Sequence, residues 1–386
     1  MGRVHGFFTE FWCCEDGESD KICVTTALKG GVVKSLYQNR TTKEIIEINP
    51  AAGSIFLHVL KKRVQCRKMR QVECKSGKNG IYISVMTEKE KIKEPLEEVI
   101  RMIFEHAVTE PEFEEAKQRT IDKLKQNFKN ATARSWYYMF EFTEMGKKYA
   151  YNKLAKALET ISYQEFYMYT EALVTPQNSI IIGNGMLEQR EITSICDILT
   201  YVRKAGTEYA DYGYVSTEEG MLDCHLVKNM PCSSMGALYF QFPDRDVTPT
   251  EKIFLLMYIN EIMFRKHGFV SADTFDASIV YFNEPICKYE KKLSDIWVKG
   301  NIENARERLL EHFGNFIRNP VESGVFMGEL FFSGVDVYTL IREIQVCDAD
   351  MVCRVYKNAD IKVSSGAIIN NEGGSEDDRR SGIKTK

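Results

Sequence analysis

The sequence predicts an α+β fold of two homologous halves, each a mainly antiparallel sheet with helices packed on one face. The chain has 386 residues, which is too long for one small core and suits two domains of similar size. A stretch of the first half recurs in the second, and the predicted elements follow in the same order in both halves. Because these elements do not alternate strictly as βαβ units, antiparallel sheets are favoured.

The repeat joins residues 127–146, NFKNATARSWYYMFEFTEMG, to residues 315–334, NFIRNPVESGVFMGELFFSG. Aligned without gaps at an offset of 188 positions, the two stretches are identical at six of their twenty positions. The offset is close to half the chain length and therefore indicates an internal duplication. The identical pairs are Asn127/Asn315, Phe128/Phe316, Ser135/Ser323, Met139/Met327, Glu141/Glu329 and Gly146/Gly334.

In the first half, β-branched and apolar runs predict strands, and periodic apolar residues after capping signals predict helices. Asn49 before Pro50 is typical of a helix start, as is Thr109 followed by Pro111 and acidic residues. In order, we expect a strand at 21–28, a helix at 49–65, a strand at 79–88, helices at 94–107, 109–128 and 162–173, and a strand at 178–185.

The second half repeats this order. Residues 347–358 stand where the helix at 162–173 stood, and residues 360–369 stand where the strand at 178–185 stood. We expect a strand at 236–243, a helix at 248–264, a strand at 276–282, helices at 289–300, 302–317 and 347–358, and a strand at 360–369.

Composition shifts give the expected boundaries. The first half spans 1–207, and a polar, aromatic linker with two glycines spans 208–220. The second half spans 221–366. We expect the remainder, 367–386, to be a disordered tail, because residues 370–386 are charged and almost free of apolar residues.

Bulk properties exclude some classes of function. The net charge of -4 leaves no basic surplus for a general nucleic-acid binder. The basic run Lys61–Gln71 is local and typical of a solvated face. No membrane span and no signal peptide are expected. Eleven cysteines without a C-x-x-C pair predict reduced thiols in the cytoplasm, with a metal site at Cys13, Cys14 and Cys23 as a minor alternative.

Three stretches carry a family resemblance: YISVMTEKEKIKEPLEEVIRMIFEHAVTEPEFEEAKQR, ISYQEFYMYTEALVTPQNSIIIGNG and MGALYFQFPDRDVTPTEKIFLLMYINEIMF. In order and length they resemble one clamshell chain of the M16 metallopeptidase family, which includes insulin-degrading and mitochondrial processing peptidases. The resemblance covers about Val24 to Gly366 in outline. It implies an M16 peptidase-like clamshell of two related halves.

The resemblance also implies where zinc would be expected. Catalytic members of the family carry H-x-x-E-H on a helix of the first half, with two histidine ligands and a glutamate that activates water. The corresponding stretch here, AGSIFLHVLKKRV, contains only His58. His5, His106, His225, His267 and His312 also lack the pattern. We therefore expect no metal and no cofactor in this chain, and interpret His58 as a packed or surface helix residue.

Four residues are candidates for substrate binding. The family carries an arginine and a tyrosine in its second half that hold the substrate backbone. Arg265 in MFRKHGFVSADTF is the nearest match here, but Ser271 stands at the expected tyrosine. A helix-terminal cation near the dipole is the alternative for Arg265. Trp136, Tyr137 and Tyr138 are interpreted as core residues first, and as a peptide-binding or subunit-contact surface second.

Two main functions remain open. In the first, the chain is a non-catalytic subunit of a heterodimeric zinc peptidase. It would complete the substrate chamber beside a zinc-bearing M16-type subunit that processes a peptide or bacteriocin precursor. In the second, it is a stand-alone pseudopeptidase that binds a leader peptide. A third reading, a cysteine nucleophile at Cys224 beside His225, is weaker because neighbours in a strand rarely face each other.

Overall fold

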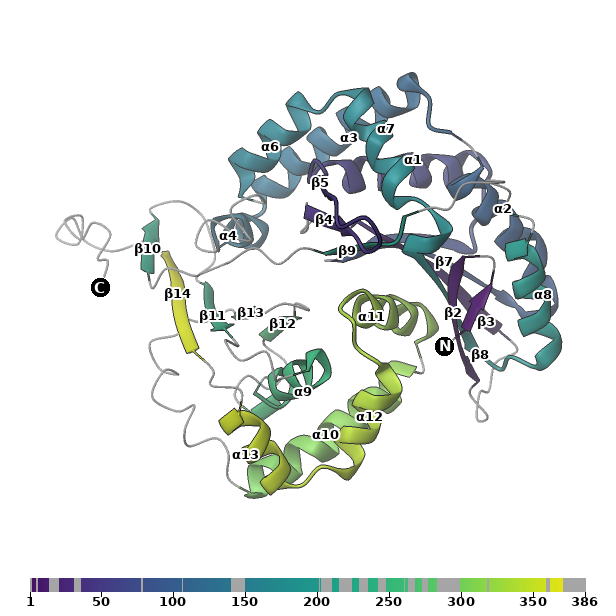
Figure 1. Ribbon diagram of the computed structural model, residues 1–386. Coiled ribbons are helices and arrows are strands. Elements are labelled where there is room, and N and C mark those ends of the chain that lie inside the picture. Colours follow the sequence, from purple (N-terminus) through teal and green to yellow (C-terminus); the bar gives the residue numbers. More distant parts are fainter. Residues whose placement is uncertain are drawn as a thin grey trace. The chain divides into compact units, whose positions relative to one another are not determined.

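The computed structural model describes residues 2–4, 6–13, 21–30, 36–77, 79–105, 107–139, 150–200, 202, 210–214, 224–228, 235–241, 248–259, 261–262, 268–272, 277–282, 299–317, 319–358 and 362–370. The chain forms two compact units (Figure 1). The first comprises Met1–Asp122, Ala155–Val215 and Gly314–Phe332, and the second comprises Lys123–Leu154, Ser216–Phe313 and Ser333–Lys386. Each unit therefore contains sequence from both halves of the chain.

The first unit is built on a six-stranded sheet of order β1-β2-β8-β3-β7-β6. All of its pairs are antiparallel except β2 with β8, which is parallel. Central strand β3 is buried at every position after Lys21, because helices cover both faces of the sheet. The strands are β1 Gly2–Val4, β2 Phe7–Cys13, β3 Lys21–Lys29, β6 Val72–Ser76, β7 Gly80–Glu88 and β8 Ser179–Gly185.

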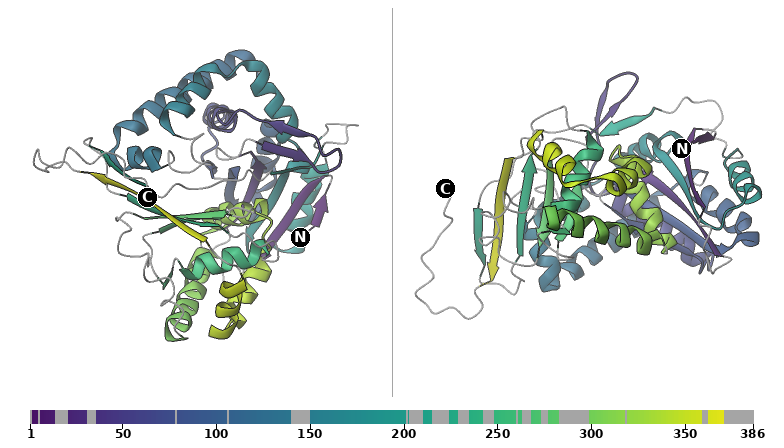
Figure 2. Two further views of the ribbon diagram at one scale, coloured as in Figure 1. Left: turned by 60° about the vertical axis from the view of Figure 1, so that its left-hand side comes forward. Right: turned by 90° about the horizontal axis from the view of Figure 1, so that it is seen from below.

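Helices from the first half cover one face of this sheet, and a helix from the second half, α11 (Pro320–Phe332), packs on β3, β7 and β8 (Figures 1 and 2). Its Glu329 carboxylate accepts the Asn79 backbone N–H, and its Glu322 pairs with Lys75 of β6. The first-half helices are α1 Ala52–Cys66, α2 Lys93–Phe104, α3 Glu110–Lys129, α7 Tyr163–Leu173 and α8 Gln189–Thr200.

A small sheet of order β5-β4-β9 holds part of the predicted linker. Strand β9 (Tyr212–Tyr214) pairs with β4 (Leu36–Asn39), which pairs with β5 (Ile45–Glu47). Asp211, just before β9, lies 3.8 Å from the buried Lys29 ammonium. Burial outweighs the attraction of Asp211 and lowers the pKa of Lys29 to about 8. The described part of the linker, residues 210–214, therefore belongs to the first unit.

The second unit contains a five-stranded sheet of order β10-β14-β11-β13-β12. Strands β10 and β14 are parallel, and the other pairs are antiparallel. This is the order and sense of β2-β8-β3-β7-β6 in the first unit, so the two sheets share one topology. The strands are β10 Cys224–Lys228, β11 Met235–Gln241, β12 Gly268–Ala272, β13 Ala277–Phe282 and β14 Lys362–Asn370.

The helices of the second unit include one from the first half of the chain. Helix α4 (Ala131–Met139) contacts β11 and β14, whose counterparts in the first sheet are β3 and β8. It comes from the first copy of the repeat, and α11 comes from the second. The other helices are α6 Tyr151–Thr160, which straddles the two units, and α9 Pro249–Ile259, α10 Lys299–Ile317, α12 Val337–Val346 and α13 Ala349–Asn358.

The α+β class with two related sheets is confirmed, and every expected strand and helix within the described residues is present. The helix expected at 289–300 lies largely outside the described residues. Strand β14 continues to Asn370, four residues into the segment expected to be a tail. No single described helix is long and apolar enough to cross a membrane, although α11 and α12 together, bent by 97°, meet the length and composition criteria.

Candidate functional site

Helix α1 stands where the resemblance would put a zinc motif. Its apolar face is buried through Ile55, Phe56, Val59 and Leu60, which fix it against the sheet of the first unit. The Asn49 side chain accepts the backbone N–H of Ala51 just before the helix, at 2.9 Å. This is a local turn before the helix and not the expected cap: the helix begins at Ala52, and its N-cap residue, Ala51, has no side-chain cap.

His58 is half-buried on α1, and its ring is fixed by two neighbours. Its Nδ1 lies 3.0 Å from the Ser54 carbonyl oxygen and 3.0 Å from Thr120 Oγ1 of α3. The Thr120 hydroxyl donates to the Ala116 carbonyl at 2.7 Å. Since a carbonyl oxygen only accepts, Nδ1 carries the proton in this arrangement. The contacts identify His58 as a packed helix residue, as expected.

The donors on α1 do not fit a zinc site of this family. If His58 were the first histidine of H-x-x-E-H, the motif would need Glu and His where Lys61 and Lys62 stand. If it were the second, the motif would need His and Glu where Ser54 and Leu57 stand. Among the described residues, no three His, Cys, Asp or Glu side chains are grouped to hold a metal. A catalytic zinc needs about three protein ligands, so we derive no zinc chemistry from α1.

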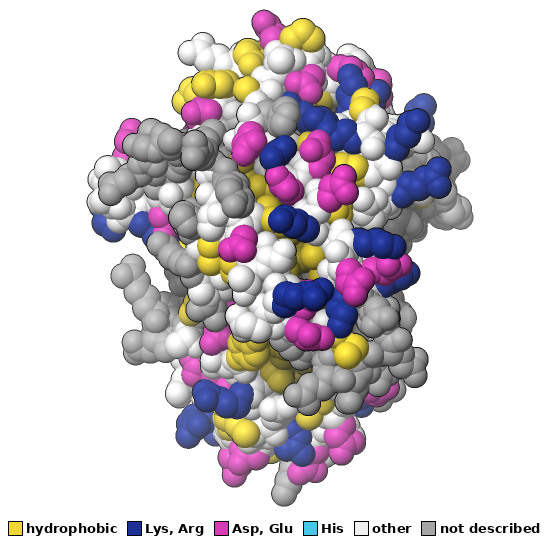
Figure 3. Space-filling model, turned by 90° about the vertical axis from the view of Figure 1, so that its right-hand side faces the viewer, with side chains coloured by type: hydrophobic (Ala, Val, Ile, Leu, Met, Phe, Trp, Pro, Cys, Tyr) yellow, Lys and Arg dark blue, Asp and Glu magenta, His cyan; other side chains and the backbone are white. Residues whose placement is uncertain are grey.

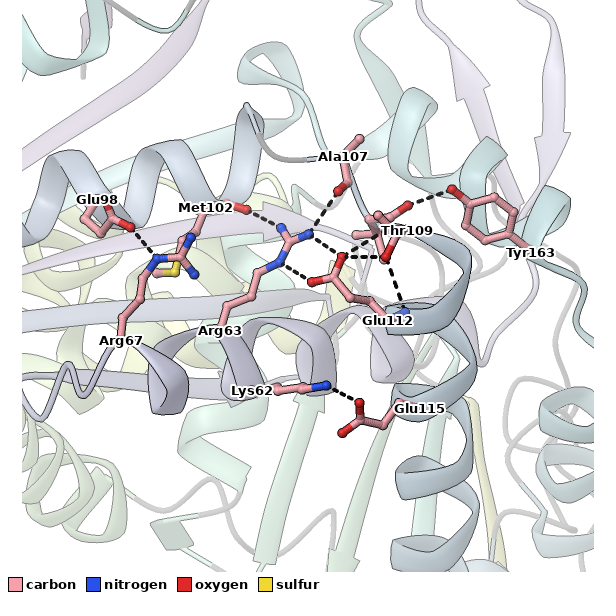
Figure 4. Close-up of polar contacts among 11 residues, drawn as sticks. Lys62, Arg63, Arg67, Glu98, Met102, Ala107, Thr109, Glu112, Glu115 and Tyr163 are labelled. Atoms are coloured by element: carbon pink, nitrogen blue, oxygen red, sulfur yellow. Dashed lines mark hydrogen bonds and ion pairs between the residues drawn. The ribbon is translucent and has the colours of Figure 1, made fainter.

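The charged residues of α1 hold helices together instead (Figure 4). The Arg63 guanidinium, only 7% exposed, binds both carboxylate oxygens of Glu112 at 3.1 Å. It also donates to the carbonyls of Met102 (2.8 Å) and Ala107 (3.1 Å). Thr109 donates its N–H (3.0 Å) and hydroxyl (3.1 Å) to Glu112, closing a capping box on α3. We call this group the Arg63–Glu112 clamp.

The clamp changes the acidity of Glu112. Burial alone would raise the pKa of this carboxyl, but hydrogen bonds from Arg63 and Thr109 and the Arg63 charge outweigh it and lower the pKa to about 2. Glu112 is therefore ionised at neutral pH and unsuited to act as a general base. The clamp supports the position of α1 and does not form a reaction centre.

Much of the basic run Lys61–Gln71 is neutralised in the same way. Lys62 pairs with Glu115, and Arg67 pairs with Glu98. On the face drawn in Figure 3, Lys and Arg side chains are interspersed with Asp and Glu. This agrees with the expectation of a solvated face for most of the run, although Lys68 and Arg70 make no ion pair with a described residue.

Next to α1, strand β6 offers an open sheet edge. It pairs with β7 on one side, and no described strand pairs with the other. Met86 N–H donates to the Gln71 carbonyl, and Gly77 N–H donates to the Gly80 carbonyl. Since bonded and non-bonded positions alternate in an antiparallel pair, the peptide groups of Cys74 and Ser76 point away from β7. Such an edge is a template for an added strand.

The sequence-predicted substrate residues lie elsewhere. Arg265 is outside the described residues. Trp136 belongs to α4, but only its backbone is described. Tyr137 is half-buried, and Tyr138 is 8% exposed. Both rings lie about 6 Å from Phe128, with centroid distances of 5.9 Å and 6.0 Å.

These tyrosines belong to an aromatic cluster of the second unit. Phe128 stacks on Tyr151 with a centroid distance of 3.9 Å, and the Arg134 guanidinium lies 5.4 Å from the Phe128 ring. Burial raises the pKa of Tyr137, which keeps its hydroxyl neutral. The arrangement fits the core interpretation for Tyr138. Their role in binding a substrate stays a prediction.

Burial makes two of the described cysteines poor nucleophiles. Burial raises the pKa of both Cys23 and Cys74 to about 11, so these thiols are protonated at neutral pH. Cys224 and His225 are successive residues of β10, and successive residues of a strand alternate between its two faces.

Sequence reasoning missed the β6 edge and the partner of Arg63. Strand β6 is only five residues long and follows a basic turn, so its pattern is weak. The sequence did predict a helix start at Thr109 with acidic residues in its first turn, but the pairing of Glu112 with Arg63 across 49 positions depends on the tertiary fold.

Comparisons with known proteins identify the fold. No family model matches the sequence, and no curated protein matches it. Solved structures do match. An M16-like peptidase from Alicyclobacillus acidocaldarius has a TM-score of 0.77 at 10% identity, covering 96% of this chain and 97% of the other.

A protease from Helicobacter pylori has a TM-score of 0.69 at 9% identity, covering 95% of this chain and 98% of the other. An inactive M16 peptidase domain from Pseudomonas fluorescens has a TM-score of 0.62 at 10% identity, covering 95% and 96%. The chain therefore has the fold of M16-like peptidases.

Proposed function

We propose that the chain is a non-catalytic, peptide-binding subunit of a heterodimeric zinc peptidase, in which a partner subunit carries the zinc. One observation carries the proposal: α1 packs on the sheet, but Lys61 and Lys62 stand where H-x-x-E-H counted from His58 would need a glutamate and a histidine. The likeness to an inactive M16 domain supports it.

The β6 edge supplies a binding role without catalysis. An extended peptide laid along β6 would bond to the outward peptide groups of Cys74 and Ser76. Holding a substrate in a productive position can lower a barrier by about 7 kcal/mol in favourable cases. A chamber wall that also excludes water from the partner's metal would add to this effect.

We further propose that the substrate is a peptide or bacteriocin precursor and that the complex works in the cytoplasm. The division of labour would be similar to that of AlbE with its zinc-bearing partner AlbF in subtilosin-type bacteriocin biosynthesis. In that arrangement this chain holds no cofactor of its own, and elemental analysis of the purified chain should find less than one tightly bound zinc.

The test is a mixing assay. A precursor peptide is incubated with this chain, with a zinc-bearing M16-type partner, and with both. We expect rapid cleavage only from the mixture, and none from this chain alone. Full-rate cleavage by the partner alone would contradict the subunit role and favour the alternative, a stand-alone pseudopeptidase that binds a leader peptide.

One strand-edge variant sharpens the assay. Ser76→Pro removes an N–H that points away from β7, so the β6–β7 ladder survives while an added strand loses a bond. Ser76→Ala keeps the N–H and serves as the matched control. Cleavage by the mixture should fall with proline and persist with alanine. Equal rates for both variants would exclude the β6 edge as the substrate-binding strand.

A further inference from the structure

A hollow of about 470 Å³ lies between the end of α1 and strand β6. Its apolar wall is formed by Val64, Met69, Val72 and Cys74. Because burial raises the pKa of the Cys74 thiol to about 11, this side chain is neutral and contributes to the apolar wall. A space of this size is typical of a pocket that takes a few side chains or a small ligand.

The rim of the hollow is cationic. It is formed by Lys61, Lys68 and Arg70 together with the amide of Gln65, and no acidic residue is among the described residues that line it. Lys68 and Arg70 are exposed and make no ion pair with a described residue, in contrast to their neighbours Lys62 and Arg67. The positive charges of Lys68 and Arg70 are therefore not neutralised by a described side chain, and they can attract a negatively charged ligand.

The turn that carries these cations is held by its own backbone. Lys68 N–H donates to the Gln65 carbonyl at 3.0 Å, and Met69 N–H donates to the Val64 carbonyl at 3.2 Å. Val72 N–H then donates to the Met69 carbonyl at 3.2 Å, which leads directly into β6. Because these hydrogen bonds hold both ends of the turn, the backbone of Lys68 and Arg70 is fixed next to the open edge of β6.

The alternation of strand side chains connects the hollow to the edge. Val72 and Cys74 line the hollow, while Lys75, on the opposite face of β6, pairs with Glu322 of α11. A peptide added along β6 would likewise send every second side chain towards α1. Those side chains would meet the hollow, with apolar atoms against its wall and charged atoms at its rim.

We propose that this hollow is a side-chain pocket for an acidic residue flanked by apolar residues in a peptide bound along β6. The inference rests on the proposed peptide-binding function and adds the class of peptide. Carboxylates would bind at the cationic rim, and aliphatic neighbours two positions away would cover Val64, Val72 and Cys74. Since the rim is exposed, its contribution should weaken as salt concentration rises.

The test uses three labelled peptides and the full chain. The probes are fluorescein-labelled Thr-Leu-Thr-Glu-Thr-Leu-Thr and the same peptide with Gln or Lys at its centre, measured by fluorescence anisotropy. Leucines and the central residue share one face of an extended strand. We expect the Glu peptide to bind about threefold to tenfold more tightly than the Gln peptide, and the Lys peptide to bind most weakly.

Variants then assign the preference to the rim. Lys68→Gln with Arg70→Gln should remove the preference, so that the Glu and Gln peptides bind this variant equally well. Lys153→Gln with Lys156→Gln on exposed positions of α6 makes the same change in net charge and should preserve it.

The outcomes separate the two levels of the proposal. If all three peptides bind equally well and Ser76→Pro weakens them all, β6 binds peptides but the acidic pocket is wrong. If no peptide binds the wild-type chain at high concentration, the peptide-binding function fails and the pocket fails with it. A preference that persists in the rim variant, but falls in the α6 variant, would also overturn the assignment.

Discussion

Helices α4 and α11 come from the two copies of one repeated stretch. Their sequences differ at the positions where α11 packs on its sheet. An added Cβ at Gly324 of α11 would lie 2.2 Å from Thr25 Oγ1, and one at Gly328 would lie 2.6 Å from the Tyr82 ring. At the aligned positions the first copy has Trp136 and Phe140. Only glycine allows the approach that α11 makes to β3 and β7. The two copies thus share their order of elements, while the glycines that allow the close approach of α11 are specific to the second copy.

A substitution that fills the space at Gly324 tests this close approach and should be the most destabilising change. Gly324→Leu would force side-chain atoms into Thr25, which is fully buried, and should lower the free energy of unfolding by about 3 kcal/mol. Chemical denaturation measures the change. Gly314→Ala in α10 is the control, since a Cβ there meets no atom within 4 Å and should stabilise by about 1 kcal/mol. Equal effects at both sites would show that α11 does not depend on close contact.

The outer helices of the two units show a second contrast. Helix α9 occupies in the second unit the place of α1 in the first, since α9 contacts β12 and α13 as α1 contacts β6 and α7. Most of α9 is buried by apolar side chains such as Phe254 and Leu255. Helix α1 instead uses the Arg63–Glu112 clamp to hold α3. Helix α1 thus carries one member of its ion pair within the helix, whereas the ion pair beside α9 joins Glu261, just after the end of α9, to Arg308 of α10.

Removing the carboxylate of this clamp should have the next largest effect. Glu112→Gln leaves a nearly buried Arg63 without its counter-charge and should lower the free energy of unfolding by about 2 to 3 kcal/mol at pH 7, since Glu112 is 29% exposed and partly screened. Glu114→Gln, on the exposed side of α3, is the matched control. A loss no larger than that of the control would mean that apolar packing alone holds α1.

The same clamp predicts a dependence on pH. The folded pKa of Glu112 is lowered to about 2 from an ordinary value of 4.5, so its stabilisation is present above pH 4.5 and lost as the pH falls towards 2. In the Glu112→Gln protein this part of the acid sensitivity should disappear. Thermal melts between pH 3 and pH 7 would show a flatter profile for the variant than for the wild-type chain.

The contrast between local and long-range signals explains what the sequence could predict. Periodicity and caps predicted strand β3 and the helices around Ser162 and Thr109, because each depends on neighbouring residues. Strand β2 was not predicted, because it pairs with β8 across more than 160 positions. The exchange of α4 and α11 between sheets also depends on tertiary packing. For the site, the β6 edge and the rim at Lys68 and Arg70 appear only when α1 and β6 are brought together.

A smaller effect should follow from the cap of α9. Thr248 Oγ1 accepts the Glu251 N–H at 3.2 Å, and Glu251 accepts the Thr248 N–H at 2.8 Å. Helix α1 has no side-chain cap at its first residue, so the two corresponding helices begin differently. Thr248→Ala should cost about 1 kcal/mol of unfolding free energy. Thr250→Ala, within the first turn, is the control and should cost nothing, because alanine favours helix.

The smallest change in unfolding free energy is expected at Tyr138, a position that is aromatic in both copies of the repeat. Tyr138 of α4 aligns with Phe326 of α11, so Tyr138→Phe gives the first copy the residue of the second. The Tyr138 ring is 8% exposed and meets Phe128 edge-on at 79°, a contact that phenylalanine retains. We expect the free energy of unfolding to fall by less than about 1 kcal/mol, the value of one hydrogen bond.

Tyr138→Ala provides the reference, because it removes the ring and should cost about 3 kcal/mol. If phenylalanine is as damaging as alanine, the hydroxyl has a role that the second copy lacks, and the two helices are not equivalent at this position. If phenylalanine is tolerated in folding but weakens binding of the labelled peptides described above, Tyr138 belongs to a contact surface. If Tyr138→Phe changes neither the free energy of unfolding nor peptide binding, only the packing of the aromatic ring matters at this position in both copies.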